Sequence, residues 1–323
     1  MRRPGRRESS IDWVFLLPAI IRIAGNRLSR LEACSTFMIT SKRRVWVTGA
    51  DGLIGSHIVA AALGCAPCFD VAGLTRAEVD LVDFDRVRVL YNIQQPSLII
   101  HCAALSQSPV CQSNPALARK LNVEVTAFLA ELAAEIGFIF FSTDLVFDGR
   151  KGYYTEDDAT NPLSIYAETK VEAEQIVLRN PRHTVVRTSL TGGVSKTKSR
   201  GFNEEILNAW KAGKTVRLFS DEFRCPIAAP VTARAIWELA ALEPRGIYHL
   251  AGGERLSRLE IGQLLAERHP ELNPQIESCS LLEYQGAPRP PDCSMNVARI
   301  ESLLSFKLPG LAQWLQENPK ADF

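Results

Sequence analysis

Five short, continuously apolar runs separated by helix-like segments constrain the fold of this chain more than any other feature. Between the runs, apolar residues recur at helical spacing, as in Leu121, Val125 and Leu129. Strands without polar alternation are typical of a sheet covered on both faces, and their alternation with helices indicates βαβ units. The sequence therefore predicts an α/β fold with a doubly wound parallel sheet, whose strands lie at 45–48, 70–74, 98–102, 138–142 and 184–187.

The overall composition excludes several classes of protein. Lys and Arg number 37 against 36 Asp and Glu, and the net charge of +1 predicts no binding to nucleic acid or to an anionic membrane. The eight cysteines are scattered, as in reduced cytoplasmic proteins, and the Cys65–Cys68 spacing lacks the second pair that a zinc site needs. The five histidines are far apart, so we predict no metal.

The first residues need a separate interpretation. A basic segment and an apolar run imitate a signal peptide, but Pro18 and Arg22 interrupt the run, and it is too short to cross a bilayer. We expect residues 1–42 to be a disordered extension or the product of a start assigned too early, with Met38 as the true beginning. No other segment resembles a membrane span, and a cytoplasmic location follows as an expectation.

A glycine-rich turn follows the first predicted strand. Gly49, Gly52 and Gly55 are spaced three apart and lie between that strand and a helix. Such glycines allow a tight turn, close approach to a pyrophosphate and close packing of helix on strand, while the helix N-terminus attracts phosphate. The motif predicts a Rossmann-type dinucleotide site, although glycines of an ordinary loop would look similar.

The end of the second strand bears on the choice of dinucleotide. An NAD site usually has an acidic residue there, whereas this chain has Thr75 and Arg76. A guanidinium pairs well with a 2′-phosphate, which favours NADP(H) over NAD(H). The alternative for Arg76 is a solvated loop charge.

Three polar side chains suggest proton-transfer chemistry. Tyr166 and Lys170 are four apart on a predicted helix and therefore share a face, so we expect the ammonium to lower the pKa of the phenol. Thr143 ends the fourth strand, at the sheet edge where ligands of such folds bind. Asn122 lies on the preceding helix.

The ordered motifs resemble those of the extended short-chain dehydrogenase/reductases, in particular the dTDP-4-dehydrorhamnose reductase-like branch. They are "VTGADGLIGS", "HCAA", "LNV", "FSTDLVFDG", "YAETK" and "VVRTS", and the similarity extends from about Arg43 almost to the C-terminus. The resemblance implies a dinucleotide-binding Rossmann domain at 43–190. It also implies a mainly substrate-binding, interleaved lobe at 191–323, with a strand near 246–252 returning to the sheet.

The resemblance also implies residue roles. Tyr166 would protonate the substrate oxygen, Thr143 would orient the carbonyl, and Lys170 would hold the nicotinamide ribose. Asn122 would support a proton-relay water. The nucleotide-sugar would contact Thr143, Asp144, Arg224 and Arg289, and Ser294 would face it. The expected cofactor contacts are Gly49, Gly52, Leu53, Ile54, Gly55, Arg76, Asp80, Leu81, Ala103, Ala104, Tyr166 and Lys170.

Leu145 narrows the expected reaction. Related sugar-nucleotide dehydratases have an Asp-Glu pair after the threonine, and leucine cannot exchange protons, which excludes elimination. The reductase branch commonly has tyrosine there, so the substrate is left open. His101 in place of a commoner asparagine and Pro226–Ile227 in place of Pro-Thr are further departures.

The sequence leaves three functions open. The first is NADP(H)-dependent reduction of the 4-keto group of a nucleotide-activated 6-deoxysugar. The second is a non-catalytic NADP-binding regulatory subunit, similar to the methionine adenosyltransferase beta subunit, and the third is a nucleotide-sugar epimerase. We interpret the helix at 202–211 as core or dimer packing, which leaves a homodimer open, and the Lys196, Lys198 and Arg200 loop as solvated rather than a diphosphate clamp.

Overall fold

The computed structural model describes residues 42–286, 288–321 and 323. The predictions for residues 1–41, including a start at Met38, lie outside the described residues. Lys42–Phe323 form one compact unit, so the division near residue 190 stays a prediction. Within the described part of the chain, no helix is long and apolar enough to span a membrane.

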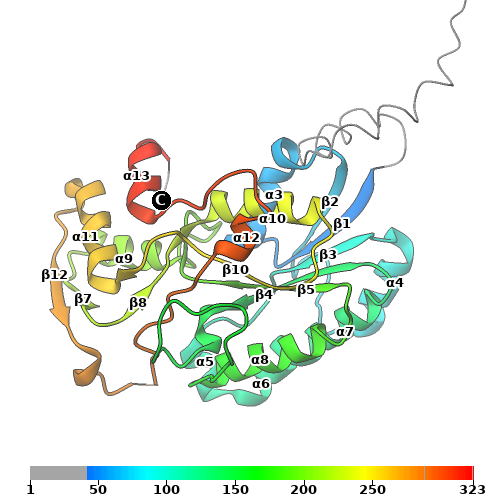
Figure 1. The fold of residues 1–323 in the computed structure, drawn as a ribbon, viewed down its shortest axis with the longest axis horizontal. Coiled ribbons are helices and arrows are strands. Elements are labelled where there is room, and N and C mark those ends of the chain that lie inside the picture. The colour runs from blue at the N-terminus through cyan, green and yellow to red at the C-terminus, as the bar shows by residue number, and fades with distance from the viewer. Residues whose placement is uncertain (1–41, 287, 322) are drawn as a thin grey trace, which may run out of the picture. The chain divides into compact units, whose positions relative to one another are not determined.

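A parallel sheet of six strands forms the centre of this unit (Figure 1). Its order is β10-β5-β4-β3-β1-β2, which confirms the predicted α/β, doubly wound fold. The predicted strands are all present and differ only at their ends. Their bounds are β1 (Arg43–Thr48), β2 (Phe69–Leu74), β3 (Leu98–His101), β4 (Gly137–Thr143), β5 (His183–Thr188) and β10 (Gly246–Leu250).

Alternate residues of the central strands enter two different cores. Val45 and Val47 belong to one apolar cluster, whereas Trp46 between them belongs to the other. Figure 1 shows α3 (Leu53–Cys65) and α10 (Ala229–Ala241) on one face of the sheet. On the opposite face lie α4 (Phe84–Gln94), α7 (Val125–Leu132) and α8 (Ile165–Val177). Burial on both faces explains why these strands read as uninterrupted apolar runs.

The chain leaves the sheet after β5 and returns to it with β10. Gly246–Leu250 pairs in parallel with Thr184–Thr188 of β5, which confirms the strand predicted near 246–252. Short connecting helices precede α7 and follow the sheet: α5 (Ser108–Ser113), α6 (Pro115–Arg119) and α12 (Ala298–Glu301). The excursion between β5 and β10 therefore contributes the first part of a second lobe before the sheet is complete.

The second lobe consists of three small strand pairs and helices. The pairs are β7 (Val216–Phe219) with β12 (Ile276–Cys279), β8 (Phe223–Arg224) with β11 (Leu256–Ser257), and β6 (Thr191–Gly192) with β9 (Ile227–Ala228). Its helices are α9 (Phe202–Lys211), α11 (Arg258–Arg268) and α13 (Leu311–Glu317). The amphipathic helix predicted at 202–211 is thus present, and its buried Phe202, Ile206 and Trp210 join the main core.

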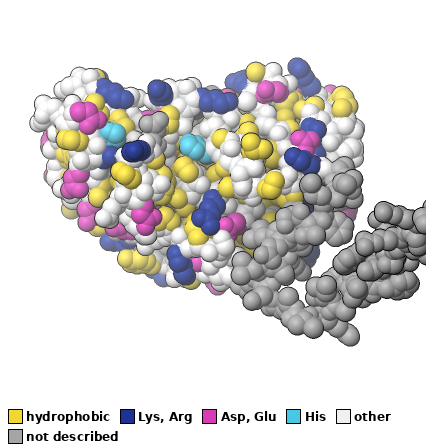
Figure 2. All heavy atoms as spheres, turned by 90° about the horizontal axis from the view of Figure 1, so that it is seen from above, with side chains coloured by type: hydrophobic (Ala, Val, Ile, Leu, Met, Phe, Trp, Pro, Cys, Tyr) yellow, Lys and Arg dark blue, Asp and Glu magenta, His cyan; other side chains and the backbone are white. Residues whose placement is uncertain are grey.

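The surface shows no charge block of one sign on the face drawn in Figure 2. Positive and negative side chains are scattered over it.

Candidate active site

The glycine turn connects β1 to α3 and lies against the end of β3. Gly49 has φ +65°, and a Cβ there would come within 2.8 Å of the Ala103 nitrogen. A Cβ on Gly55 would lie 2.2 Å from the Gly49 carbonyl oxygen, so only glycine allows the helix to pack this close. Leu53 and Ile54 begin α3, whose first turn has no side-chain cap and no acidic residue. Its N–H groups are therefore available to an anion.

Arg76 lies just beyond β2 and its side chain is 85% exposed. Its guanidinium pairs with Asp80, with 3.3 Å between Nη2 and Oδ2, and Leu81 follows. Glu78, which was not predicted from the sequence, accepts hydrogen bonds through its carboxylate from the backbone N–H and the hydroxyl of Thr75. An acidic group therefore stands near the strand end after all, three residues later than expected.

The Thr143 hydroxyl and the Tyr166 phenol face one another. Thr143 is the last residue of β4, and Tyr166 lies in the first turn of α8, which Ser164 caps. Their hydrogen-bonding contact is one of the influences on the phenol pKa. The Leu145 N–H donates to Thr143 Oγ1 at 3.2 Å, so residue 145 positions the threonine through its backbone. These two oxygens share one site.

The predicted effect of Lys170 on Tyr166 is wrong. Burial raises the pKa of the Tyr166 phenol, and the Asp144 carboxylate raises it further, while Thr143 acts in the opposite direction. Lys170 is itself buried, which lowers the pKa of its ammonium to about 7, and its Nζ lies 4.0 Å from the centre of the Phe140 ring. Burial thus weakens the cation that was expected to act on the phenol.

Asn122 lies in a π-helical turn, Lys120–Glu124, at the start of α7. Its Oδ1 accepts from the Leu105 N–H at 2.8 Å, and its Nδ2 donates to the Leu105 carbonyl at 3.1 Å. Nδ2 also donates to Thr169 Oγ1 at 3.0 Å. The amide therefore clamps the segment that follows β3 to α8, and its predicted support of a relay water stays a prediction.

Asp144 and Arg224 lie beneath the site and are 4% and 3% exposed. The Asp144 carboxylate accepts hydrogen bonds from Ser189 at 2.7 Å and from Thr143 at 3.1 Å, and lies 3.7 Å from Arg224 Nε. Arg224 also donates to the carbonyls of Phe223 and Pro290. Because these groups already have protein partners, their placement does not favour the direct substrate contact expected from the sequence.

Glu222 joins the predicted substrate arginines. It is 2% exposed and pairs with Arg289, with Nε–Oε2 2.8 Å and Nη2–Oε1 2.9 Å, and with Arg224 at 3.1 Å. Arg289 itself is 38% exposed and remains reachable from solvent. Ser294 is buried and accepts from the Tyr153 N–H at 2.7 Å. Glu222 is far from Arg289 in sequence, so no local pattern revealed this network.

The basic loop before α9 is organised by one acidic side chain. Glu204 accepts hydrogen bonds from the backbone of Ser195, Arg200 and Gly201 and from the Ser195 hydroxyl. These contacts explain the fold of the loop without a bound ligand.

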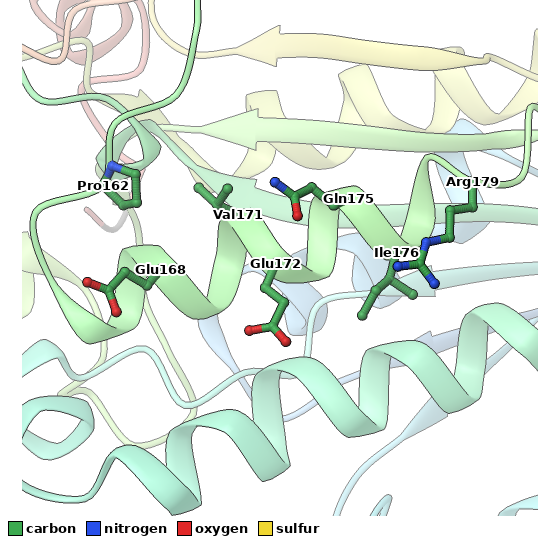
Figure 3. Close-up of a pocket in the computed structure, with 7 residues that line it drawn as sticks. All are labelled: Pro162, Glu168, Val171, Glu172, Gln175, Ile176 and Arg179. Carbon is green, nitrogen blue, oxygen red and sulfur yellow. The ribbon is translucent and has the colours of Figure 1, made fainter.

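A hollow of about 450 Å³ lies on the outer face of α8 (Figure 3). Glu168, Glu172 and Arg179 line it, and Glu172 pairs with Arg119 at 2.5 Å. The buried Thr169 and Lys170 lie on the other side of the helix. This hollow is therefore separate from the Thr143–Tyr166 pair. Among residues 42–286, 288–321 and 323, no cluster of three His, Cys, Asp or Glu could hold a metal ion.

Comparisons with known proteins bear on the family and the fold of this chain. The family described as RmlD substrate binding domain matches residues 43–320. Methionine adenosyltransferase 2 subunit beta of Rattus norvegicus is 30% identical over 277 residues, 81% of this chain and 82% of that protein. A probable low-salt glycan biosynthesis reductase of Haloferax volcanii is 31% identical over 284 residues, 82% and 94% of the two chains.

A solved structure shows the same fold. That of dTDP-4-dehydrorhamnose reductase from Bacillus anthracis in complex with NADP has a TM-score of 0.78 at 22% identity. It covers 86% of this chain and 98% of its own.

Proposed function

The chain belongs to the RmlD substrate-binding-domain family of extended short-chain dehydrogenase/reductases, and we propose that it reduces the 4-keto group of a nucleotide-activated 6-deoxysugar with NADP(H). The observation that carries this proposal is the contact between the Thr143 hydroxyl and the Tyr166 phenol at the end of β4. The similar glycan biosynthesis reductase and the similar dTDP-4-dehydrorhamnose reductase support the reaction class.

The residues around the glycine turn fit a dinucleotide. Gly49 and Gly55 leave no room for side chains, the first turn of α3 is uncapped, and Ala103 lies beside the turn. We assign the phosphates to this turn and the 2′-phosphate to the exposed Arg76, which would exchange Asp80 for the phosphate. NADP in the similar Bacillus anthracis structure supports this choice, and NAD(H) is the alternative.

The protein contributes position and a proton. The bound nicotinamide supplies the hydride. Tyr166 donates its phenolic proton to the substrate oxygen, because the raised pKa keeps the phenol protonated at neutral pH. Thr143, held by the Leu145 N–H, turns its one hydroxyl hydrogen from Asp144 to the same oxygen when the substrate binds, and so orients that oxygen. We assign Asp144 and Arg224 to holding Thr143 in place and the half-exposed Arg289 to the nucleotide-sugar diphosphate.

The direct test is NADPH oxidation by the purified full chain across a panel of keto nucleotide-sugars. We expect oxidation with a 4-keto-6-deoxy nucleotide-sugar, faster with NADPH than with NADH. Binding of NADPH without oxidation by any keto nucleotide-sugar would contradict the proposal. Conversion of the sugar without net NADPH consumption would favour the epimerase instead.

The similarity to the methionine adenosyltransferase subunit favours a second candidate, a non-catalytic NADP-binding regulatory subunit. Co-purification of a stoichiometric partner, together with the absence of turnover, would support it. A cytoplasmic location and a homodimer stay predictions under either function.

Gly55→Ala should weaken NADPH binding by about tenfold or more, because the added methyl would meet the Gly49 carbonyl and force the turn or the helix to shift. Titration of bound NADPH by its fluorescence measures the change. Gly64→Ala is the matched control, since it lies on the same helix and nothing lies within 4 Å of a Cβ there. Equal affinities of the two variants would show that the turn does not bind the phosphates.

A further inference from the structure

His101 is a buried histidine that the proposed chemistry does not use. Thr48, His101 and Thr126 are 0%, 1% and 0% exposed and come from β1, β3 and α7. The ring lies between the two hydroxyls, with Nδ1 2.7 Å from Thr48 Oγ1 and Nε2 3.1 Å from Thr126 Oγ1. Both ring nitrogens therefore have partners, and the histidine connects two elements that flank β3.

Thr48, His101 and Thr126 form a row of hydrogen-bonded side chains, and their other contacts fix which atom donates and which accepts at each step. Thr126 donates its only hydroxyl hydrogen to the Asn122 carbonyl at 2.7 Å, so its oxygen must accept from His101 Nε2–H. In a neutral ring Nδ1 then accepts from Thr48, whose oxygen accepts from the Ala103 N–H at 3.3 Å. Burial lowers the pKa of His101 to about 3, which keeps the ring neutral, and Lys170 from α8 contributes in the same direction.

The two ends of the row lie at the two halves of the site. At one end, the backbone of Ala103 packs directly against Gly49 of the glycine turn, where a Cβ would lie 2.8 Å from the Ala103 nitrogen. At the other end, Asn122 clamps Leu105 and donates to Thr169, which in turn donates to the Tyr166 carbonyl at 2.7 Å. A series of hydrogen bonds therefore runs from Ala103, beside the glycine turn, through the backbone and side chain of Asn122 to the helix that carries Tyr166 and Lys170.

We propose that His101, in its Nε2–H form, is a positioning residue that fixes the backbone at Ala103 relative to the start of α8. This proposal rests on the proposed function only because NADPH is the ligand whose affinity is measured in the test. A histidine that merely fills the core would stabilise the fold equally well without transmitting anything between Thr48 and Thr126. The two roles therefore differ in whether the effects of Thr48 and Thr126 on NADPH affinity are coupled, and not in how much the histidine stabilises the fold.

The test is a double-mutant cycle on NADPH affinity in the full chain. Thr48→Val and Thr126→Val each remove one hydroxyl with little change of shape, and we expect each to raise the NADPH dissociation constant about tenfold. The double variant should be no weaker than the worse single variant, because both break the same row. In a His101→Asn background, which cannot reach both hydroxyls, this non-additivity should disappear.

Thr232→Val is the matched control. Thr232 is also fully buried and donates to the carbonyl of Ala228, four residues earlier in its helical segment, but it lies on α10. It should lower thermal stability while leaving NADPH affinity unchanged. Multiplicative effects of Thr48→Val and Thr126→Val, or single variants that change stability alone, would overturn the proposal and leave His101 as a core residue.

Hydrogen exchange is a second test of the role of His101, and it does not require NADPH. Exchange of the Ala103 amide should accelerate in Thr126→Val, although the two residues share no direct hydrogen bond, and it should stay unchanged in Thr232→Val. If wild-type protein binds no NADPH, the proposed function fails while this measurement still decides the role of His101. Slow exchange at Ala103 in Thr126→Val would contradict that role.

Discussion

Tyr166→Phe should lower the rate of carbonyl reduction by about 10²- to 10⁴-fold, the usual contribution of a positioned general acid. Phenylalanine keeps the ring at the start of α8 but removes the hydroxyl that faces Thr143. Because burial and Asp144 raise the pKa of the phenol, the wild-type group is protonated at neutral pH and ready to donate. The loss should affect kcat and kcat/KM equally, as for an interaction formed only in the transition state.

NADPH titration and steady-state kinetics together check this result. NADPH affinity should be unchanged, since the variant retains the glycine turn and Lys170. Tyr91→Phe is a matched control that removes a phenol from α4, where the ring packs edge-on against Trp46. A Tyr166→Phe enzyme that keeps more than about a tenth of the wild-type rate would remove this residue from the mechanism.

Acid should unfold this protein unusually steeply between about pH 6 and pH 4 because buried histidines, above all His101 and His249, remain neutral in the native state. Burial is the main cause that lowers the pKa of His101 and of His249 to about 3, with Lys170 and Arg187 as the respective neighbouring charges. The unfolded chain titrates near the ordinary value of 6.5. Between these values it binds more protons than the native state, so the free energy of unfolding falls as the pH falls.

Each of these two histidines should lower the free energy of unfolding by about 1.4 kcal/mol for each pH unit of acidification in this window. Asp144 acts in the opposite direction, because burial raises the pKa of its carboxyl and the folded protein takes up that proton. Urea unfolding at a series of pH values measures the slope. His249→Asn should reduce this slope by the contribution of one histidine. Asn is a suitable replacement because its amide can still donate to the Asn296 carbonyl that His249 Nδ1 contacts.

A core truncation separates this effect from general destabilisation. Val186 is fully buried in β5 and carries no titrating group, so Val186→Ala should lower the free energy of unfolding by a similar amount at every pH. An unchanged pH slope in His249→Asn would show that the ring is already protonated in the native protein at mildly acidic pH.

Much of the fold could be predicted because the relevant signals are local. A strand buried on both faces must be apolar throughout, and Trp46 between Val45 and Val47 shows why: adjacent residues enter opposite cores. The glycine turn is equally local, since Gly55 lies six residues from the Gly49 carbonyl that excludes a Cβ. The same locality placed Thr143 at the end of β4.

The electrostatics of the site could not be predicted because they depend on burial and on distant partners. Helical spacing placed Lys170 one turn from Tyr166 but could not show that Lys170 is buried and that its pKa falls to about 7. Asp144 raises the phenol pKa, and its partner Arg224 is far away in sequence. Glu222 was missed for the same reason, since its arginine partner Arg289 comes from another segment of the second lobe.

The late return of β10 to the sheet has a consequence for biosynthesis. When residue 190 leaves the ribosome, β5 still lacks its outer neighbour, because Gly246–Leu250 has not yet been made. The nascent chain then displays a row of unpaired peptide groups along an apolar strand, a template for pairing with other chains. Completion of the sheet must await synthesis of residues 191–245, so the edge of β5 needs protection from other chains during that interval.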